Sequence, residues 1–385
     1  MKKLAIVTTH PIQYYAPIFQ LLAARGQVEI MVFYTWGERV LSKFDPGFGR
    51  PVAWDIPVLQ GYPYTWAENR SRDPGTHHFG GIHTPGLVGQ VLGWKPDAVL
   101  IFGWSWRGHL RAMRAFKHRI PVFFRGDSTL LNERGGPKSW LKAVFLKWVY
   151  RHIDVAFYVG TNNKAYFRRY GVREDQLVFA PHATDNDRFR AEPAGAGDAI
   201  RKSLGIRPDE VLVLYAGKFE EVKNVALLLD VFQQLAEPGV HLLLVGNGPL
   251  EAALKEAAAN HSRVHLMDFR NQTAMPAIYL AADLFCLPSL SESWGLAVNE
   301  AMACGRAVLV SDRVGCAADL VSEANGAVFR SGSHADLLHR LTHLIRSRKE
   351  LQAMGHCSAQ RIAEWNFERI ADAIEQQVLS GKENS

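Results

Sequence analysis

Residues 288–308 read PSLSESWGLAVNEAMACGRAV, and they are the most informative part of the sequence. It follows an apolar run typical of a buried strand, starts with small polar residues and a glycine, continues with helix-forming residues and stops at a second glycine. This order predicts a strand, a loop, a helix and another strand. Backbone N–H groups at the start of such a helix favour an anion, for example a phosphate. These groups belong to Ser293, Trp294, Gly295 and Leu296.

Apolar runs typical of strands alternate with helical stretches on both sides of this segment. We expect strands at residues 3–8, 28–34, 98–102, 120–124 and 153–159, and again at 211–215, 240–245, 263–267, 283–287 and 306–310. The alternation is typical of parallel sheets covered by helices. The sequence therefore predicts an α/β protein with two Rossmann-like domains, in which ligands bind beyond the carboxyl ends of the strands.

Small, structure-breaking residues near position 195 separate the two series of strands. We place the N-terminal Rossmann-like domain at residues 1–190, a linker at 191–199 and the C-terminal Rossmann-like domain at 200–365. Apolar residues at three-to-four spacing follow. We expect 366–385 to form a helix that packs back on the N-terminal domain and to end in a polar tail.

Composition and charge narrow the classes of function. The chain has 385 residues, 48% of them hydrophobic and 21% charged, as in ordinary globular enzymes. A net charge of +6 favours an anionic ligand such as a nucleoside diphosphate, an acidic lipid or a nucleic acid. Nucleic acid is disfavoured because no zinc-finger spacing or aromatic–basic RNA-binding strand occurs. No apolar run has membrane-spanning length and the apolar start is too short for a signal peptide, so we expect a cytoplasmic protein.

Two carboxylates stand eight residues apart within residues 288–308. Glu292 lies in the predicted loop, and Glu300 lies about two turns along the predicted helix, so they cannot form a close acid–base pair. Separated carboxylates beside a phosphate site suit hydroxyl recognition, because each accepts hydrogen bonds from vicinal hydroxyls. We assign Glu292 to a sugar and Glu300 to a ribose. The alternative is that both are solvated glutamates without a ligand.

A basic cluster follows the predicted strand at 211–215. Gly217 and Lys218 lie in a loop, and Lys223 follows five residues later at the start of a predicted helix. Both ammonium groups could reach a diphosphate leaving group, whose charge a helix terminus alone compensates weakly. Exposed lysines at helix starts are common, so the alternative is a solvated surface.

Together these motifs resemble glycosyltransferase family 4, whose hallmark is a glutamate pair spaced E-x7-E in a stretch like E-G-F-G-L…E-A-M-A-x-G. Glu292 and Glu300 occupy the two positions. The family's basic pair resembles Lys218 and Lys223, with lysine in place of the usual arginine. Further similarity lies in the segment around Asn247, in YLAADLF at 279–285 and in PHATDNDRF at 181–189. The resemblance is strong from about residue 155 onward and architectural before that.

The resemblance implies the GT-B fold, with two Rossmann-like domains facing a central cleft. It implies a retaining transfer of a sugar from a nucleoside-diphosphate sugar, without a metal or other cofactor, to a glycan or lipid-linked acceptor, as in polysaccharide or glycoconjugate synthesis. The N-terminal domain would bind the acceptor and the C-terminal domain the donor. Lys218 and Lys223 would stabilise the diphosphate and Glu292 would hold the sugar. The donor site would also include Gly217, Asn247, the backbone near Phe269, residues 293–296 and Glu300.

The N-terminal half departs from the family pattern at two strand ends. His10 and Gln13 stand where many members have a glycine-rich loop, and they are candidates for phosphate or sugar binding or for a packing role. Arg125 and Asp127 stand where many members place a histidine. We take these two residues as candidate catalytic contacts at the reacting centre, with a structural loop as the alternative.

Two further segments of the N-terminal half have patterns that could suggest a membrane or a metal. Residues 140–153 form an apolar and basic helical pattern without a single basic face, which favours a packed helix over peripheral contact with an anionic membrane. His77, His78 and His83 lie in a loop without an acidic partner in the sequence pattern, so we expect no metal there. The alternative functions are a nucleotide-sugar epimerase or hydrolase on the same fold, and a non-catalytic binding subunit.

Overall fold

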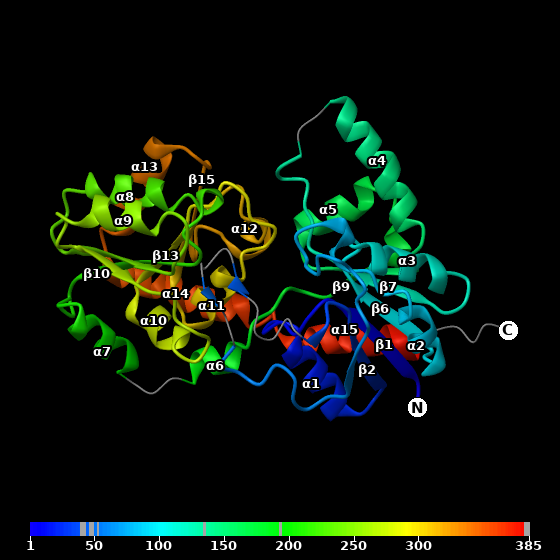
Figure 1. Cartoon of the computed structure of the whole chain (residues 1–385). Helices are drawn as coiled ribbons and strands as arrows, with labels where there is room; N and C mark the ends of the chain where they lie inside the picture. The colour runs from blue at the N-terminus through cyan, green and yellow to red at the C-terminus, as the bar shows by residue number, and fades with distance from the viewer. Residues whose placement is uncertain (39–43, 46–49, 52–53, 134–135, 192–194, 381–385) are drawn as a thin grey trace. The chain divides into compact units, whose positions relative to one another are not determined.

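The computed structural model describes residues 1–38, 44–45, 50–51, 54–133, 136–191 and 195–380. Contacts between residues divide the chain into two units. Unit 1 comprises Met1–Lys43, Pro57–His182 and Phe367–Ser385, and unit 2 comprises Phe44–Ile56 and Ala183–Asn366. Each unit contains its own parallel sheet covered by helices (Figure 1), which confirms the predicted fold class.

Unit 1 is built on a seven-stranded sheet with the order β5-β2-β1-β6-β7-β8-β9. Its strands are β1 (Lys3–Thr8), β2 (Glu29–Tyr34), β5 (Tyr64–Trp66), β6 (Ala98–Phe102), β7 (Val122–Arg125), β8 (Val155–Tyr158) and β9 (Leu177–Phe179). Its helices are α1 (Ala16–Arg25), α2 (Leu87–Gly93), α3 (Arg107–Phe116), α4 (Pro137–Tyr150), α5 (Thr161–Arg169) and α15 (Phe367–Leu379), with 3-10 turns η2 (Phe79–Gly81) and η3 (Glu174–Gln176). The sequence predicted the long strands but not β5 or β9, because three residues are too few for a clear apolar pattern.

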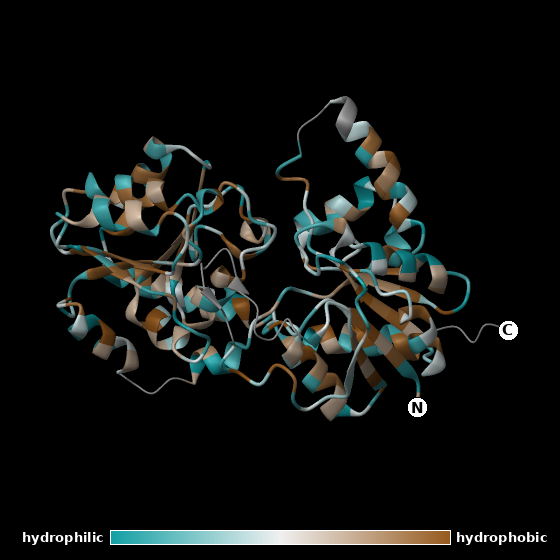
Figure 2. Ribbon diagram, viewed as in Figure 1, coloured by the Kyte–Doolittle hydropathy of each residue, from teal (hydrophilic) through white to brown (hydrophobic). Residues whose placement is uncertain are grey.

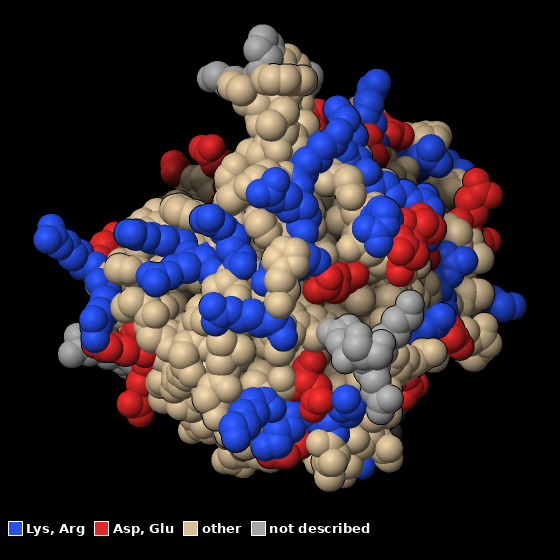
Figure 3. Space-filling model, turned by 90° about the vertical axis from the view of Figure 1, so that its right-hand side faces the viewer, with Lys and Arg blue, Asp and Glu red and all other residues tan. Residues whose placement is uncertain are grey.

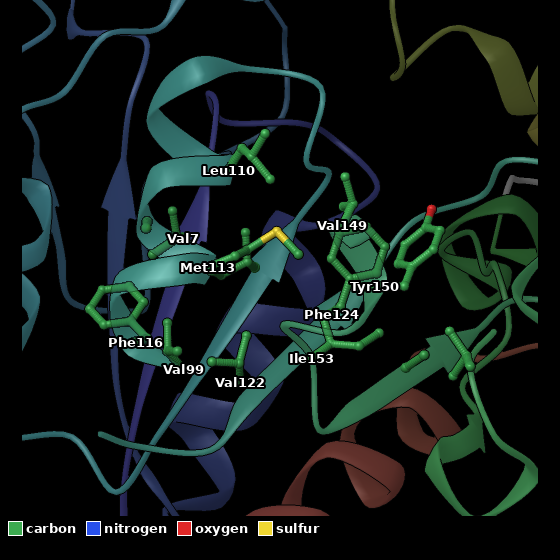
Figure 4. Packing of buried hydrophobic residues seen from close by; sticks show 14 of the residues in the cluster. Val7, Val99, Leu110, Met113, Phe116, Val122, Phe124, Val149, Tyr150 and Ile153 are labelled. Atoms are coloured by element: carbon green, nitrogen blue, oxygen red, sulfur yellow. The ribbon is translucent and has the colours of Figure 1, made fainter. Parts of the chain in front are cut away.

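The core of unit 1 lies between the sheet and helices α3 and α4. Leu110, Met113 and Phe116 on α3 are buried at the spacing of one helix face and meet Val7 and Val99 from the sheet (Figure 4). Helix α4 adds buried residues with the same spacing, among them Leu146, Val149 and Tyr150. Hydrophobic residues colour the strands of the sheet brown in Figure 2. Each helix therefore has one face that is fixed by this core.

Unit 2 is built on a six-stranded sheet with the order β12-β11-β10-β13-β14-β15. Its strands are β10 (Val211–Ala216), β11 (Val240–Val245), β12 (Val264–Met267), β13 (Leu284–Leu287), β14 (Ala307–Ser311) and β15 (Gly326–Phe329). Its helices are α6 (Asn186–Arg190), α7 (Ala196–Ser203), α8 (Val225–Gln233), α9 (Glu251–Ala258), α10 (Met275–Ala281), α11 (Leu296–Ala303), α12 (Ala317–Leu320), α13 (His334–Leu344) and α14 (Arg348–Ile362), with the 3-10 turn η4 (Glu221–Lys223). A short pair, β3 (Phe44–Asp45) and β4 (Arg50–Pro51), also belongs to this unit.

Segments distant in sequence complete each unit. In unit 1, helix α15 packs on α1, where Arg25 donates to Asp372 at 2.6 Å and to Glu375 at 3.0 Å. In unit 2, Thr273 donates its backbone N–H to Asp55 at 3.2 Å. The predicted linker at 191–199 overlaps the start of α7 at Ala196, and residues 192–194 lie outside the described residues.

The loops after β10 and β11 approach each other so closely that only glycine fits. Gly246 has φ +150°, and a Cβ atom there would lie 1.9 Å from the carbonyl oxygen of Gly217. Phe219 donates its N–H to the carbonyl of Asn247 at 2.9 Å, which holds the loops together. The two loops therefore form one rigid support at the edge of the sheet.

We expect Gly246→Ala to destabilise unit 2 by about 3 kcal/mol, because the carbonyl of Gly217 must move and the backbone of residue 246 is strained. The melting temperature in differential scanning calorimetry should fall by about 5 to 10 °C. Gly239→Ala is the matched control, since the nearest atom to its added Cβ is a side-chain carbon of Glu210 at 3.7 Å. Equal melting temperatures for the two variants would contradict the close approach.

Candidate active site

The strand order of unit 2 reverses between β10 and β13, which are neighbours in the sheet. From β10 the chain proceeds outward to β11 and β12, and from β13 it proceeds in the other direction to β14 and β15. The loops that leave the two central strands therefore diverge and open a crevice at their carboxyl ends. Lys218 and Lys223 follow β10, and Glu292 follows β13.

Lys223 and Glu292 form an ion pair at this crevice. The Nζ atom of Lys223 contacts Oε2 of Glu292, although 69 residues separate them, and both side chains are about one-fifth exposed. Lys223 ends the turn η4, and Asn224 follows in the left-handed conformation with φ 54° before α8 begins. Leu290 donates its N–H to the carbonyl of Val222 at 2.8 Å. A backbone hydrogen bond thus fixes the loop of the lysine against the loop of the glutamate.

The backbone of Glu292 is held on its other side by the loop after β14. Its N–H donates to the carbonyl of Arg313 at 3.1 Å, and its carbonyl accepts from Gly315 N–H at 3.0 Å, which makes a short parallel bridge with Val314. Gly315 is required there, because a Cβ atom would lie 1.8 Å from the carbonyl oxygen of Ser293. Three loops therefore position one carboxylate, as a pre-organised site requires.

Glu300 lies on α11 beneath this loop and is almost completely buried. Its Oε2 atom accepts a hydrogen bond from Tyr279 Oη at 2.8 Å. Trp294 is also buried, and its indole N–H donates to Asn299 Oδ1 at 2.9 Å. The side chain of Trp294 therefore points into the interior, and the backbone of this residue leads into the start of α11. Gly295 precedes the helix with φ +98°.

The remaining predicted donor residues follow β10, β11 and β12 along the same edge. Asn247 accepts from the Phe269 N–H at 2.7 Å through its Oδ1 atom and donates to Glu251 at 2.8 Å. The carbonyl of Lys218, next to Gly217, accepts from Tyr215 Oη at 2.7 Å. The structure thus brings all the predicted donor residues to the carboxyl edge of one sheet.

Unit 1 has a second reversal of strand order, between β1 and β6. His10 and Gln13 follow β1 and are half-buried. The Nδ1 atom of His10 lies 2.8 Å from Thr9 Oγ1, and its ring meets the edge of Trp36 with centroids 4.9 Å apart. Burial lowers the pKa of His10 to about 4, so its ring is neutral at physiological pH.

The sequence analysis missed the loop after β6, which leaves the sheet beside the loop of His10. It reads Gly103-Trp104-Ser105-Trp106, and Ser105 is exposed. Trp104 donates to Tyr150 Oη and Trp106 to the carbonyl of Thr76, each at 3.2 Å, so both indoles are anchored. The signal that could have found this loop is its place directly after a predicted strand.

Arg125 and Asp127 have different surroundings at the end of β7. The buried guanidinium of Arg125 donates to the carbonyls of Ala180 and Pro181, each at 2.7 Å. Burial lowers the pKa of Arg125 to about 10, which leaves it charged at neutral pH. The carboxylate of Asp127 is 44% exposed and lies 3.8 Å from His182 Nε2. The Arg125 guanidinium is thus bound to backbone carbonyls, while the Asp127 carboxylate is accessible from solvent.

The expectation that the histidine loop has no acidic partner is wrong. Asp73 Oδ2 lies 3.1 Å from His77 Nε2 and 3.3 Å from His78 Nε2. The three side chains are exposed, and the exposed cluster by itself does not define a metal site.

Two family models match the chain: "Glycosyl transferase 4-like domain" over residues 21–183 and "Glycosyl transferases group 1" over residues 197–361. The chain belongs to the family 4 type of glycosyltransferases. It is 29% identical to D-inositol 3-phosphate glycosyltransferase from Segniliparus rotundus over 216 residues, which are 53% of this chain and 47% of the relative. The chain thus spans about half the length of the curated relatives it matches.

Solved structures extend the likeness of this family 4-type chain over its whole length. Anabaena HepE in complex with UDP and glucose has a TM-score of 0.72 and 16% identity, with 99% of this chain and 100% of that chain covered. Sucrose-phosphate synthase from Thermosynechococcus elongatus has a TM-score of 0.74 and 19% identity, with the same coverage. Both share the fold, which confirms the GT-B architecture. None of the helices within the described residues is long and apolar enough to cross a membrane.

His109 links two loops of unit 1 in this glycosyltransferase-family chain. Its burial predicts that the stability of the protein depends on pH. The ring is fully buried between Thr35 Oγ1, at 2.7 Å, and the carbonyl of Gly103, at 2.9 Å. Burial lowers the pKa of His109 to about 4, against about 6.5 in the unfolded chain. Because the unfolded state binds the proton first, stability is lost as the pH falls from about 6.5 to about 4, by about 2 kcal/mol at pH 5.

We expect the melting temperature of the wild type to fall more between pH 7.5 and pH 5 than that of His109→Asn, by about 5 °C. Asparagine keeps a donor near the Gly103 carbonyl but cannot titrate. The comparison uses the difference between the two pH values, so a constant loss of packing cancels. The same pH dependence in both proteins would show that His109 does not titrate on unfolding.

Proposed function

We propose that the protein is a retaining glycosyltransferase that transfers a sugar from a nucleoside-diphosphate sugar to a glycan or lipid-linked acceptor. The contact between Lys223 and Glu292 at the strand reversal of unit 2 carries this proposal. It pairs a cation suited to a diphosphate with a carboxylate suited to sugar hydroxyls, beside the N-terminus of α11. Family membership supports the same conclusion.

The ion pair suggests how the donor is received. A diphosphate oxygen is an equivalent anionic partner for the Lys223 ammonium, so the donor can take the place of the Glu292 carboxylate. The released carboxylate then accepts hydrogen bonds from the sugar hydroxyls. Lys218 adds a second positive charge from the same loop, and Glu300 accepts from the ribose. Binding gives the Lys223 ammonium a new anionic partner, and hydrogen bonds from the hydroxyls satisfy the Glu292 carboxylate.

The proposed reaction breaks the bond between the anomeric carbon of the sugar and the diphosphate oxygen. The acceptor hydroxyl oxygen forms a bond to the same carbon on the same face, and its proton passes to the leaving phosphate oxygen. Lys218 and Lys223 stabilise the negative charge that develops on the diphosphate, as positioned cations do in other transfer reactions. Every charge in this scheme comes from the chain and the donor, so it does without a metal or other cofactor.

Unit 1 would contribute the acceptor side. Neutral His10 offers a hydrogen bond without adding charge, and Asp127 offers an accessible carboxylate. Arg125 acts as a positioning residue, because its guanidinium holds the carbonyls of Ala180 and Pro181. Nucleic acid has no place in this scheme. UDP-glucose is the first donor to test, since the structurally similar HepE was solved with UDP and glucose.

Glu300→Gln should weaken binding of the nucleotide sugar by about 10- to 100-fold, because a charge-assisted hydrogen bond contributes about 1.5 to 3 kcal/mol. A thermal-shift screen with UDP-, GDP-, ADP- and dTDP-sugars measures this binding, and UDP-sugars should raise the melting temperature of the wild type. Tyr279→Phe is the control, since it removes the internal hydrogen bond to Glu300 and keeps the carboxylate. If both variants weaken binding equally, Glu300 has only a structural role.

Lys223→Ala should lower kcat by about 100- to 1000-fold with a smaller change in KM for the donor, because it removes a positive charge from the leaving group. Release of the nucleoside diphosphate in a coupled assay measures this rate. Lys202→Ala removes an exposed charge from α7 and should leave kcat unchanged. Unchanged turnover in Lys223→Ala would refute its role.

The products of the wild-type reaction distinguish the alternative functions. Free sugar as the product would favour the hydrolase, and an isomerised nucleotide sugar would favour the epimerase. Donor binding without any product would favour the non-catalytic subunit.

A further inference from the structure

Helix α4 has one face in the core of unit 1 and leaves the opposite face exposed. Ala143, Leu146 and Tyr150 are buried. On the other side lie large apolar side chains with high exposed fractions, namely Trp140 at 66%, Leu141 at 62%, Val144 at 51% and Phe145 at 41%. Figure 2 shows brown patches along this helix. Helix α4 is therefore packed on one face, as the sequence predicts, and exposes large apolar side chains on the other.

The exposed apolar residues lie close together, and Trp148 is a fifth member of the group. Residues 140, 141, 144, 145 and 148 follow the spacing of a single helix face. Phe145 stacks on Trp148 with ring centroids 5.7 Å apart, and Trp104 meets Phe145 at 5.6 Å. Monomeric proteins rarely expose such a contiguous apolar patch without a binding role. We call these five residues of α4 the apolar face.

Basic side chains border the apolar face. Arg114 on α3 lies over the ring of Trp148 at 5.2 Å, and Arg151 approaches the same ring at 5.9 Å. Arg107 and Arg111 precede Arg114 at helical spacing, and all three are exposed. Within the described residues, no ion pair with a carboxylate involves Arg107, Arg111 or Arg114. We call these three residues the arginine row.

The net positive charge of the protein is concentrated around these helices. Residues 104–153 contain eleven Lys and Arg but only two acidic residues, which gives +9, whereas the whole chain carries +6. The rest of the chain is therefore net negative. Neither α3 nor α4 contains an acidic residue. Figure 3 shows Lys and Arg side chains gathered below the tan projection at the top of the view.

We propose that the apolar face of α4 and the arginine row of α3 form a docking surface for an anionic lipid membrane. Trp140, Leu141 and their neighbours would enter the boundary between headgroups and acyl chains. The arginines would remain at the headgroups and pair with lipid phosphates. The basic residues of α4 itself do not form a single face. The arginines beside the apolar face come from α3, which the sequence pattern of α4 alone does not reveal.

Two other occupants of this surface fit the charges less well. A second copy of the chain would bring two arginine rows close together, and like charges across an interface repel. A nucleic acid would satisfy the arginines but would leave the apolar side chains of Leu141 and Val144 in water. An anionic membrane satisfies both parts of the surface at once. The inference rests on the proposed function and deepens it. A chain that docks on a membrane would meet a lipid-linked acceptor rather than a soluble glycan.

Sedimentation of the 385-residue chain with vesicles tests the proposal. The wild type should bind vesicles of phosphatidylcholine with phosphatidylglycerol, and binding to pure phosphatidylcholine should be at least about tenfold weaker. High salt should release the protein, because the arginine contribution is screened. Trp140→Ser/Leu141→Ser and Arg107→Gln/Arg111→Gln/Arg114→Gln should each weaken binding by about tenfold or more.

Matched controls change the same chemistry elsewhere. Phe79→Ser/Leu379→Ser removes exposed apolar residues of unit 1, and Lys202→Gln/Arg346→Gln/Lys349→Gln removes three exposed charges of unit 2. Both control proteins should bind the vesicles like the wild type. The thermal shift with UDP-sugar should be unchanged in all four variants, so it reports folding and the donor site independently of docking. If UDP-sugar does not raise the melting temperature of the wild type, the proposed donor is refuted but the docking surface is not.

Several results would overturn the docking proposal. These are no binding of the wild type to either kind of vesicle, equal binding to both kinds, or an equal loss of binding in the control variants. Sedimentation velocity would show a second copy as the occupant if the wild type were dimeric and the α4 variant monomeric. Binding to duplex RNA or DNA in preference to anionic vesicles would assign the surface to nucleic acid instead.

Discussion

The ion pair between Lys223 and Glu292 depends on the reversal of strand order at the centre of the unit 2 sheet. Two loops that are 69 residues apart in sequence leave adjacent parallel strands, so a lysine and a carboxylate meet at one edge. The pair is partly buried and therefore less screened than a surface ion pair. The backbone contacts of the neighbouring loops hold these two charges at this edge, which we propose as the donor site.

Close backbone packing makes this edge rigid. Gly246 lets the loop after β11 touch the carbonyl of Gly217, and Gly315 lets the loop after β14 touch the loop of Glu292. A site that works by electrostatics gains from such rigidity, because charges already in position need no reorganisation when the substrate arrives. The carboxylate of Glu300, which lies on α11 below the loop, is also held in place, because it is buried and accepts a hydrogen bond from Tyr279. Conformational freedom is thus removed before binding.

The charge of the protein is divided between two tasks. Around the proposed donor site a few positive charges have specific partners, as Lys223 has Glu292. Around α3 and α4 many positive charges have no carboxylate opposite them within the described residues, and they surround exposed aromatic rings. The first arrangement favours recognition of one anion at a defined place. The second favours attraction to an extended anionic surface, for which the number of charges matters more than their exact geometry.

The sequence by itself determined the α/β class, the long strands and the loops in which Lys218, Lys223 and Glu292 stand, because apolar periodicity and glycine positions are local properties. Short strands such as β9 and the loop after β6 escaped notice, since three residues carry little pattern. Only the tertiary structure decided that Lys223 meets Glu292, that backbone carbonyls occupy Arg125, and that α3 supplies the basic border of α4. These are contacts between distant segments, and their distances depend on strand order and helix packing, which a local pattern does not encode.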